Sequence, residues 1–268
     1  MLCRWTPALR GVRQLFVETK GVRGRWDGGP GRAKIGMMRA RVVEVFASLQ
    51  GEGCYVGEGQ VFVRFAGCPF RCQWCDTPEA LDIQTAAGRD YTVGELLEEV
   101  DRLLRCHRLT AVTVTGGEPL AQKGFLRQWL SEMRHRGVRI YLESSGILYR
   151  SLIDVMKYVD VVAMDMKLPS SCGEQSFWVE HEAFLRVADE KEVFVKVVVT
   201  SRTSLEEIRR AAEITARVNP DRPFILQPVY PDPGGHALAR CLRGQRIGRG
   251  LLRRVRVIPQ MHKFLKIP

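Results

Sequence analysis

Three cysteines lie within eight residues of one another, in the segment 67–75 (GCPFRCQWC), as Cys68, Cys72 and Cys75. Cysteine thiolates are the ordinary ligands of iron–sulfur clusters, and a 4Fe–4S cluster contains four irons. Three closely spaced thiolates would therefore leave one iron without a protein ligand. Such an iron can bind a small molecule through its amine and carboxylate groups beside a reducing cluster. The spacing thus predicts one-electron chemistry on a bound molecule.

A structural zinc site is the main alternative interpretation of these cysteines, and a set of unreactive core thiols is the third. Structural zinc normally takes four nitrogen or sulfur ligands from two closely spaced pairs. The sequence has no second pair, because the other cysteines stand alone and the five histidines show no paired spacing. Cys54 is not expected to be a fourth ligand, since it would block the open iron. The pattern favours the cluster and leaves zinc open.

A predicted buried strand leads into a glycine pair at 116–119 (GGEP). The preceding residues, AVTVT, are apolar or β-branched, as expected for a buried strand. Glycines at the end of a strand allow the backbone to approach a ligand closely. We expect Glu118 or the neighbouring main-chain groups to accept hydrogen bonds from an ammonium group there.

The cysteine segment and the glycine pair together resemble the radical S-adenosylmethionine superfamily. Cys68, Cys72 and Cys75 match its C-x3-C-x2-C loop, and residues 116–119 match its GGEP motif. The resemblance implies that these cysteines hold a 4Fe–4S cluster and that its open iron chelates S-adenosylmethionine. One electron would then cleave the carbon–sulfur bond and give a 5′-deoxyadenosyl radical. The implied fold is α/β, a partial (β/α)6 barrel with an open side.

Within that superfamily, the chain is similar to the 7-carboxy-7-deazaguanine synthase family. The matching segments are 46–53 (FASLQGEG), 62–67 (FVRFAG), 143–146 (ESSG), 165–167 (DMK), 227–229 (QPV) and 262–268 (HKFLKIP). This similarity implies a lyase that converts 6-carboxy-5,6,7,8-tetrahydropterin to 7-carboxy-7-deazaguanine by radical ring contraction with loss of ammonia, in queuosine and 7-deazapurine biosynthesis. It also implies bound Mg2+, an external flavodoxin-like electron donor and a homodimer.

The same resemblance, carried over residue by residue, implies three groups of site residues. The contacts to the pterin substrate are Leu49, Gln50, Gly51, Arg64, Thr115 and Pro268. The contacts to S-adenosylmethionine are Trp74, Cys75, Asp76, Gly117, Asp165, Met166, Lys167, Gln227, Pro228, Val229 and Tyr230. The implied Mg2+ ligand is Thr77, with the substrate supplying other ligands.

Two of these assignments have a physical reason of their own. The planar guanidinium of Arg64 can bind a carboxylate through two charge-assisted hydrogen bonds. Pro268 is the last residue of the sequence, and the resemblance implies that its terminal carboxylate accepts from the guanidine-like edge of the pterin. We expect the apolar residues of the segment 264–267 to hold this tail in place.

Alternating strands and helices are predicted to position these residues. Strands are predicted near 61–66, 111–115, 138–142, 159–164, 193–199 and 223–227, and helices over 93–105, 124–136 and 204–218. This alternation predicts a parallel sheet with right-handed crossovers. The cysteine segment and the GGEP and QPV segments follow or end predicted strands, where the sites of α/β proteins usually lie.

Composition and charge divide the chain into a leader and a body. The formal net charge is +11, and residues 1–36 contribute +6 from eight Lys or Arg and two acids. We expect residues 1–36 to be a disordered basic leader and residues 37–268 to form a single catalytic domain. The sequence has neither a run of 18 apolar residues nor a secretory signal. These features predict a cytoplasmic protein without a membrane partner.

Two other functions remain open. A glycyl-radical-enzyme activating enzyme shares the cysteine loop but needs a protein substrate, whereas the LQGEG segment, Arg64 and Pro268 suit a small pterin. A metal-stabilised nucleic-acid-binding protein is supported only by the positive charge. The second basic tract, residues 240–266 with nine Lys or Arg and no acid, suits an anionic substrate equally well. We therefore expect no nucleic-acid partner.

Overall fold

The apolar runs of the chain form strands, and most of the segments between them form helices. The computed structural model describes residues 38–268, and the leader predicted for residues 1–36 lies outside them. The strands are β1 (Arg39–Leu49), β2 (Gly59–Phe65), β3 (Arg89–Thr92), β4 (Ala111–Gly116), β5 (Arg139–Ser144), β6 (Val161–Asp165), β7 (Glu192–Val199), β8 (Phe224–Pro228) and β9 (Val255–Val257).

Helices cover the segments between most of these strands. The α-helices are α1 (Val93–His107), α2 (Lys123–Arg134), α3 (Tyr149–Val155), α4 (Pro169–Cys172), α5 (Trp178–Ala188), α6 (Leu205–Val218), α7 (His236–Arg249) and α8 (Met261–Leu265). Short 3-10 turns are η2 (Gly53–Tyr55), η3 (Pro78–Ala80), η4 (Pro119–Gln122) and η5 (Met156–Tyr158). The three predicted helices are confirmed as α1, α2 and α6, with ends that differ by one or two residues.

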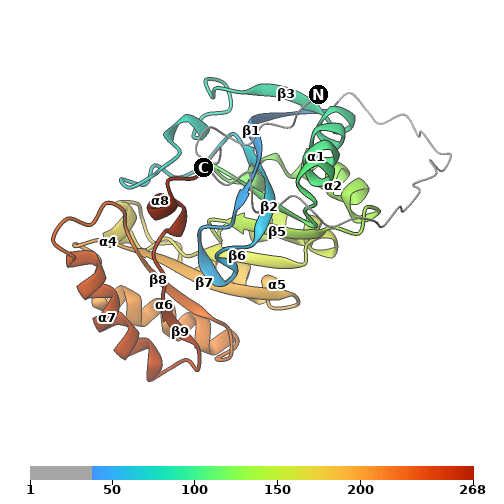
Figure 1. The fold of residues 1–268 in the computed structure, drawn as a ribbon. Coiled ribbons are helices and arrows are strands. Elements are labelled where there is room, and N and C mark those ends of the chain that lie inside the picture. Colours follow the sequence, from blue (N-terminus) through green and yellow to red (C-terminus); the bar gives the residue numbers. More distant parts are fainter. Residues whose placement is uncertain (1–37) are drawn as a thin grey trace.

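All described strands belong to one open sheet in the order β3-β1-β2-β4-β5-β6-β7-β8-β9 (Figure 1). Strand β2 pairs in parallel with β4, and every later strand pairs in parallel with the one before it. The six predicted strands are therefore confirmed, and so is the parallel sheet. Because the sheet does not close on itself, the predicted partial barrel with an open side is confirmed as well.

The first strand was not predicted, and it runs antiparallel to both of its neighbours, β2 and β3. Its sequence, RARVVEVFASL, alternates between buried residues and more exposed ones, among them Arg39, Arg41 and Glu44. A strand with one solvated face carries charged residues at every second position, which interrupts the apolar run that identifies a buried strand. Strand β1 thus extends the parallel sheet beyond β2.

Local sequence signals explain where the main helices begin. The Thr92 hydroxyl accepts a hydrogen bond from the Glu95 amide, and the Glu95 carboxylate accepts one from the Thr92 amide, which forms a capping box at the start of α1. Ser204 caps α6 in a similar way, since its hydroxyl accepts from the Glu206 amide. Both helices therefore start directly after the strand or loop that precedes them.

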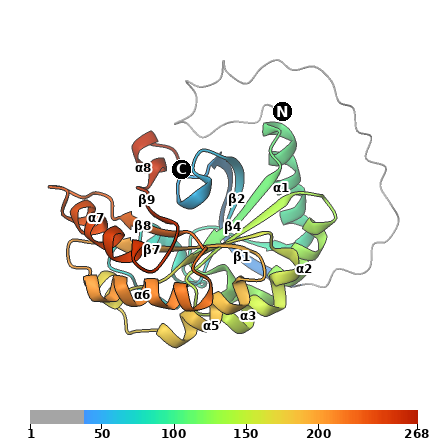
Figure 2. The same ribbon diagram turned by 90° about the horizontal axis from the view of Figure 1, so that it is seen from below.

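The helices α1, α2, α3, α5, α6 and α7 form an arc along the outer face of the sheet, whereas α8 lies on the inner side (Figure 2). The hydrophobic core fills the space between the arc and the sheet, and it includes the fully buried Leu96, Trp129, Phe184 and Ile208. Within residues 38–268, no helix has both the length and the apolar character needed to cross a bilayer.

Successive side chains of a strand point to opposite faces of the sheet, so each parallel strand has a core set and an inner set. On β7, Val193, Val195 and Val197 belong to the main core under the helices. Phe194 instead belongs to a smaller apolar cluster on the inner face, together with Ala111, Tyr141, Val161 and Ile225. Beyond this cluster, towards the carboxyl ends of the strands, the inner face becomes polar.

Candidate functional site

A cavity lies on the inner face of the sheet, at the carboxyl ends of the strands. Strands β4 to β8 contribute Thr115, Glu143, Asp165, Lys196 and Gln227 to its walls. The structure brings nearly all the predicted site residues to this one cavity. The predicted residues in its lining are Leu49, Gln50, Gly51, Arg64, Cys68, Cys72, Trp74, Cys75, Asp76, Thr77, Thr115, Asp165, Lys167, Gln227, Val229, Tyr230 and Pro268.

Three predicted contacts are outside this lining. The side chain of Met166 is fully buried in the main core, and Pro228 is buried at the end of β8. Gly117 lies directly behind the cysteine loop, because a Cβ atom there would be 2.9 Å from Cβ of Cys68. These residues shape the walls, and only their main-chain atoms could reach a ligand.

All three cysteines of the loop line this cavity. A turn in which the Cys75 amide donates to the Cys72 carbonyl at 3.0 Å shapes the loop, and the Cys68 amide donates to the Leu81 carbonyl at 3.0 Å. Burial raises the pKa of the Cys68 thiol to about 11. Since metal ligation requires thiolates, the binding of a cluster releases protons here. The donor set fits a metal cluster with one open position.

The glycine pair is required by close contacts within the protein and does not only leave space for a ligand. Gly116 has a φ of +145°, and a Cβ atom on it would lie 2.1 Å from the Phe65 carbonyl oxygen. A Cβ atom on Gly117 would lie 2.7 Å from the carbonyl oxygens of Gly67 and Ala80. The glycines therefore allow the end of β4 to pack directly against β2 and the cysteine loop.

Glu118 does not face the cavity, so of the two alternatives, its carboxylate or the neighbouring main-chain groups, only the main-chain groups are placed to receive an ammonium group. The side chain is fully buried. It accepts hydrogen bonds from the Ser144 hydroxyl at 3.0 Å, from the Ser145 amide at 2.7 Å and from the Leu120 amide at 3.1 Å. Burial raises the pKa of Glu118, and the hydrogen bonds from Ser145 oppose that rise. Glu118 thus ties the end of β4 to the end of β5.

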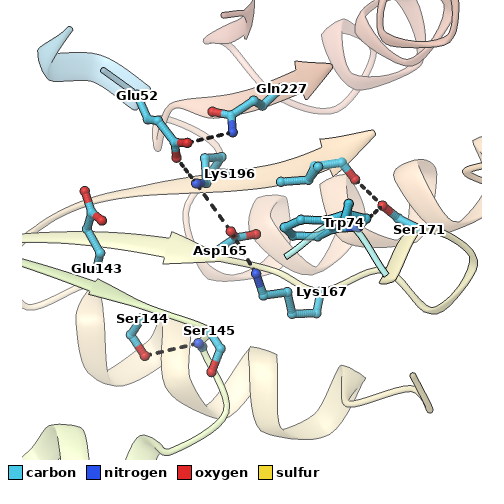
Figure 3. Close-up of polar contacts among 12 residues, drawn as sticks. Glu52, Trp74, Glu143, Ser144, Ser145, Asp165, Lys167, Ser171, Lys196 and Gln227 are labelled. Carbon is cyan, nitrogen blue, oxygen red and sulfur yellow. Dashed lines mark hydrogen bonds and ion pairs between the residues drawn. The ribbon is translucent and has the colours of Figure 1, made fainter. Parts of the chain in front are cut away.

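A chain of alternating charges crosses the cavity floor (Figure 3). The Lys196 ammonium pairs with Glu52 and lies 3.3 Å from Asp165. Asp165 in turn pairs with the Lys167 ammonium at 2.9 Å. The Lys167 nitrogen lies 4.4 Å from the centroid of the Trp74 ring. Opposite charges therefore compensate one another on a floor that is largely shielded from water.

The charge chain keeps both carboxylates ionised. Burial alone would raise the pKa of Glu52, but the positive charge and hydrogen bond of Lys196 and the hydrogen bond of Gln260 hold that pKa at about 2. Burial likewise opposes ionisation of Asp165, and the charges of Lys167 and Lys196 lower its pKa below the ordinary value. Both carboxylates of the floor are therefore charged at neutral pH, each beside an ammonium group.

Two buried acceptor atoms on this floor have no hydrogen-bond partner among the described residues, namely Oδ1 of Asp165 and Oε1 of Gln227. Unpaired buried acceptors are costly, and most are satisfied by a partner or a ligand. A molecule with hydroxyl or ammonium donors, such as S-adenosylmethionine, would supply the missing hydrogen bonds. The predicted cofactor contacts Asp165 and Gln227 thus fit that cofactor.

The predicted substrate contacts Gln50 and Thr115 meet at one carboxylate. The Gln50 amide donates to Glu143 at 2.9 Å, and the Thr115 hydroxyl donates to Glu143 at 2.8 Å. Arg64 lines the same cavity, and its Nε donates to Glu44 at 2.7 Å. The terminal nitrogens of Arg64 are further donors that could bind a carboxylate.

The last residue of the chain reaches the cavity from the side of β1. The Ser48 hydroxyl donates to the Pro268 main-chain oxygen at 2.9 Å, which places the end of the chain against β1. The Met261 amide donates to the Gly51 carbonyl at 2.8 Å. A Cβ atom on Gly51 would lie 2.2 Å from Nδ1 of His262, so only glycine allows this approach.

Two groups on the cavity wall could hold a cation. Glu52, Asp76 and His262 each offer one ligand atom, and these atoms lie within 4.8 Å of one another. The oxygens of Glu52 already accept from Lys196 and from two glutamines, however. Thr77, directly after Asp76, makes no capping hydrogen bond with its side chain. Its hydroxyl suits Mg2+, which prefers hard oxygen ligands.

Sequence reasoning missed Lys196 and gave no role to Glu52 and Glu143. A signal for Lys196 was present, because it is the one charged residue inside the apolar run VFVKVVV of a predicted strand. Cys54, by contrast, packs against the smaller apolar cluster of the inner face. Its place there agrees with the expectation that it is not a cluster ligand.

Comparisons with known proteins connect this cavity to a family. Residues 62–223 match the family model described as the Radical SAM superfamily. A 7-carboxy-7-deazaguanine synthase of Geobacter sulfurreducens is 37% identical over 243 residues, which cover 84% of this chain and 97% of the relative. One from Methanothermobacter thermautotrophicus is 33% identical and covers 85% and 98% of the two chains.

The fold has a solved counterpart in the crystal structure of QueE from Escherichia coli. The two structures superpose with a TM-score of 0.59, at 21% identity, over 87% of this chain and all of that one. This likeness concerns the fold, and it agrees with the open sheet. Because the superfamily match spans residues 62–223 and the curated relatives cover most of the sequence, the chain belongs to the radical SAM superfamily and, within it, to the 7-carboxy-7-deazaguanine synthase family.

Proposed function

We propose that this chain is a lyase that converts 6-carboxy-5,6,7,8-tetrahydropterin to 7-carboxy-7-deazaguanine, with loss of ammonia, in 7-deazapurine biosynthesis. The observation that carries the proposal is the convergence of the three cysteines, two unpartnered buried acceptors and the substrate contacts on one cavity. Cys68, Cys72 and Cys75 would hold a 4Fe–4S cluster, which would supply the electron for cleavage of S-adenosylmethionine. The surrounding residues bind and orient the two molecules.

The floor of the cavity holds S-adenosylmethionine in this proposal. Oδ1 of Asp165 and Oε1 of Gln227 accept hydrogen bonds from its hydroxyl or ammonium groups. Lys167 packs over the Trp74 ring at 4.4 Å, and the Trp74 indole donates to the Ser171 hydroxyl at 3.1 Å. These contacts fix the indole beside the cysteine loop, where it can form one wall for the cofactor.

The opposite wall holds the pterin. Glu143, oriented by Gln50 and Thr115, is placed to accept from the amino group and ring N–H of the pterin edge, a contact that a bidentate carboxylate makes well. The terminal nitrogens of Arg64 bind the substrate carboxylate. Thr77 contributes one oxygen to a Mg2+ ion whose other ligands include the substrate. Holding the carboxylate in one position restricts the geometry available during ring contraction.

Several parts of the proposal concern the protein as a whole. Residues 37–268 act as the single catalytic domain, and the basic leader 1–36 is dispensable for turnover. The electron comes from an external one-electron carrier of the flavodoxin type in the cytoplasm. The active form is a homodimer.

The test is anaerobic reconstitution of the full chain with iron and sulfide, followed by reaction with the carboxypterin, S-adenosylmethionine, Mg2+ and a strong reductant. We expect brown protein with about four irons per chain and formation of 7-carboxy-7-deazaguanine, identified by mass spectrometry. Cys72→Ala should abolish turnover. Cys241→Ala is the matched control, because Cys241 is a buried cysteine of the main core. Colourless or zinc-loaded wild-type protein, or an active Cys72→Ala variant, would overturn the proposal.

A further inference from the structure

Two fully buried polar side chains, Gln60 on β2 and Thr113 on β4, lie one layer below the cavity, and the function proposed above gives them no role. Side chains two residues apart on a strand share a face of the sheet. Gln60 therefore shares its face with Phe62, and Thr113 with the substrate contact Thr115. Neither Gln60 nor Thr113 is among the described residues that line the cavity itself. Buried polar groups are costly unless they are hydrogen-bonded, so their partners indicate their role.

Gln60 connects an exposed carboxylate to the predicted substrate contact Gln50. Nε2 of Gln60 donates to the Glu58 carboxylate at 3.3 Å. That carboxylate also accepts from the Tyr141 hydroxyl at 2.9 Å. Oε1 of Gln60 accepts from the Thr113 hydroxyl and from Nε2 of Gln50, the latter at 3.4 Å. Both ends of the Gln60 amide therefore have partners, although the side chain is fully buried.

Gln50 in turn contacts Glu143, the carboxylate that is placed to accept from the pterin edge. Nε2 of Gln50 donates to Glu143 at 2.9 Å, and Oε1 of Gln50 accepts from the Glu52 amide at 3.0 Å. The main chain of Gln50 is held as well, because its amide donates to the Glu58 carbonyl at 2.7 Å. The side-chain NH2 group of Gln50 thus donates to both Glu143 and Gln60.

The carboxylates at the two ends of this chain determine the orientation of both amides. An ionised carboxylate only accepts hydrogen bonds. Gln60 must therefore turn its NH2 group to Glu58, which leaves its carbonyl oxygen for Gln50. A Gln50 amide turned the other way would place its own oxygen against both the Gln60 oxygen and the Glu143 carboxylate, and these acceptors would repel one another. Only one orientation of Gln50 satisfies all its neighbours.

We propose that Gln60 is a positioning residue that acts through Gln50. Its carbonyl oxygen holds the Gln50 amide in the orientation that fixes Glu143 for the pterin edge, and the Thr113 hydroxyl holds that oxygen in place. Without this acceptor, one buried N–H of Gln50 has no partner, and the amide populates other orientations. Affinity for the pterin then falls in proportion to the fraction that remains competent. The inference rests on the proposed function, because it requires Glu143 to bind the pterin.

The test measures the affinity of each variant for two ligands. Full-length proteins are reconstituted anaerobically, and calorimetric titration with Mg2+ but without reductant gives one Kd for the carboxypterin and another for S-adenosylmethionine. Gln60→Met keeps the size of the side chain but removes its polar atoms. Thr113→Val removes only the hydroxyl, whereas Thr113→Ser retains it. Thr215→Val is the matched control, because Thr215 is also fully buried and its hydroxyl donates to the Ala211 carbonyl at 2.9 Å within α6.

We expect Gln60→Met to raise the Kd of the carboxypterin about fivefold to tenfold and Thr113→Val to raise it about threefold to fivefold. The Kd of S-adenosylmethionine should stay within about twofold of wild type in both, and Thr113→Ser and Thr215→Val should leave both values within that range. Added to Gln50→Ala, Gln60→Met should have less than about twofold further effect, because its effect passes through Gln50. A merely structural role would weaken the binding of both ligands and would persist in Gln50→Ala.

Three results would overturn the inference. One is a wild-type Kd for the carboxypterin in Gln60→Met, and another is an undiminished effect of Gln60→Met in Gln50→Ala. The third, which decides the matter if Gln60→Met does not fold, is an equal Kd for the carboxypterin in Thr113→Val and Thr113→Ser. Failure of the proposed function is distinguishable, since the wild-type protein would then not bind the carboxypterin at all.

Discussion

Replacing Lys196 by methionine should be among the most destabilising single changes in the cavity. The Lys196 ammonium compensates Glu52 and Asp165, and the three side chains are only 13%, 18% and 16% exposed. Methionine keeps most of the volume but removes the charge. The two carboxylates then lose their shared cation, and only Asp165 retains another, Lys167.

The pKa of Glu52 gives the magnitude. The folded protein holds this pKa at about 2, against an ordinary value of 4.5. At about 1.4 kcal/mol per pH unit, the difference corresponds to about 3 kcal/mol in favour of the charged form, supplied largely by Lys196. Breaking a buried ion pair by removing one partner typically costs about 3–5 kcal/mol. We therefore expect Lys196→Met to lower the free energy of unfolding by about 3 kcal/mol at pH 7.

Urea unfolding followed by circular dichroism under anaerobic conditions measures this loss. The matched control is Lys123→Met, because Lys123 pairs with Asp154 at 3.0 Å but the two side chains are 50% and 42% exposed. An exposed pair contributes less than about 1 kcal/mol. Adding Glu52→Gln to Lys196→Met should recover at least about 1 kcal/mol as coupling energy. Equal losses in the two lysine variants, or additivity in the double variant, would refute the reasoning.

Three further predictions concern stability. Burial lowers the pKa of His181 from 6.5 to about 4. Because the unfolded state then binds a proton at a higher pH than the folded state, the free energy of unfolding should fall by about 2 kcal/mol between pH 7 and 5, as measured by urea unfolding. A His181→Gln variant with the same pH dependence as wild type would contradict this. Gly116→Ala places a Cβ atom 2.1 Å from a main-chain oxygen of β2 and should lower the free energy of unfolding by more than about 2 kcal/mol in urea. The control Gly94→Ala, in open space on α1, should raise it by about 0.5–1 kcal/mol. Similar changes in the two variants would be evidence against the clash. Phe184→Ala removes a fully buried ring and should lower the free energy of unfolding by about 3–5 kcal/mol in the same assay. The Phe264 side chain is 60% exposed, so Phe264→Ala should change it by less than about 0.5 kcal/mol. A comparable loss in both variants would argue against the assigned core.

The parallel strands could be predicted because both of their faces are covered, one by helices and one by the inner cluster, which leaves near-continuous apolar runs in the sequence. Strand β1 could not, since its exposed positions carry Arg39, Arg41 and Glu44. The three-residue β9 and the five-residue α8 are too short to produce a periodic pattern. Their places depend on contacts with β8 and Gly51, which are distant in sequence.

Motif matching identified most of the residues that line the cavity, but it could not distinguish residues that face a ligand from residues that hold the fold together. Glu118 belongs to the GGEP motif, but its carboxylate accepts hydrogen bonds from the end of β5 and does not face the cavity. Lys196 belongs to none of the matched motifs and yet compensates two carboxylates of the floor. Hydrogen-bond partners are set by strand register and by loop conformation, and a linear pattern does not contain either.

The division of each parallel strand into two faces has a consequence for mutational scanning of this chain. On β7, odd-numbered positions such as Val195 contribute to the core, and even-numbered ones such as Lys196 contribute to the cavity. The parity is reversed on β5, where Leu142 faces the core and Glu143 the cavity, and also on β4, with Val114 in the core and Thr115 in the cavity. Libraries restricted to the cavity parity on each strand, with Lys196 held constant, would therefore vary the residues that line the cavity, and libraries of the other parity would vary the core.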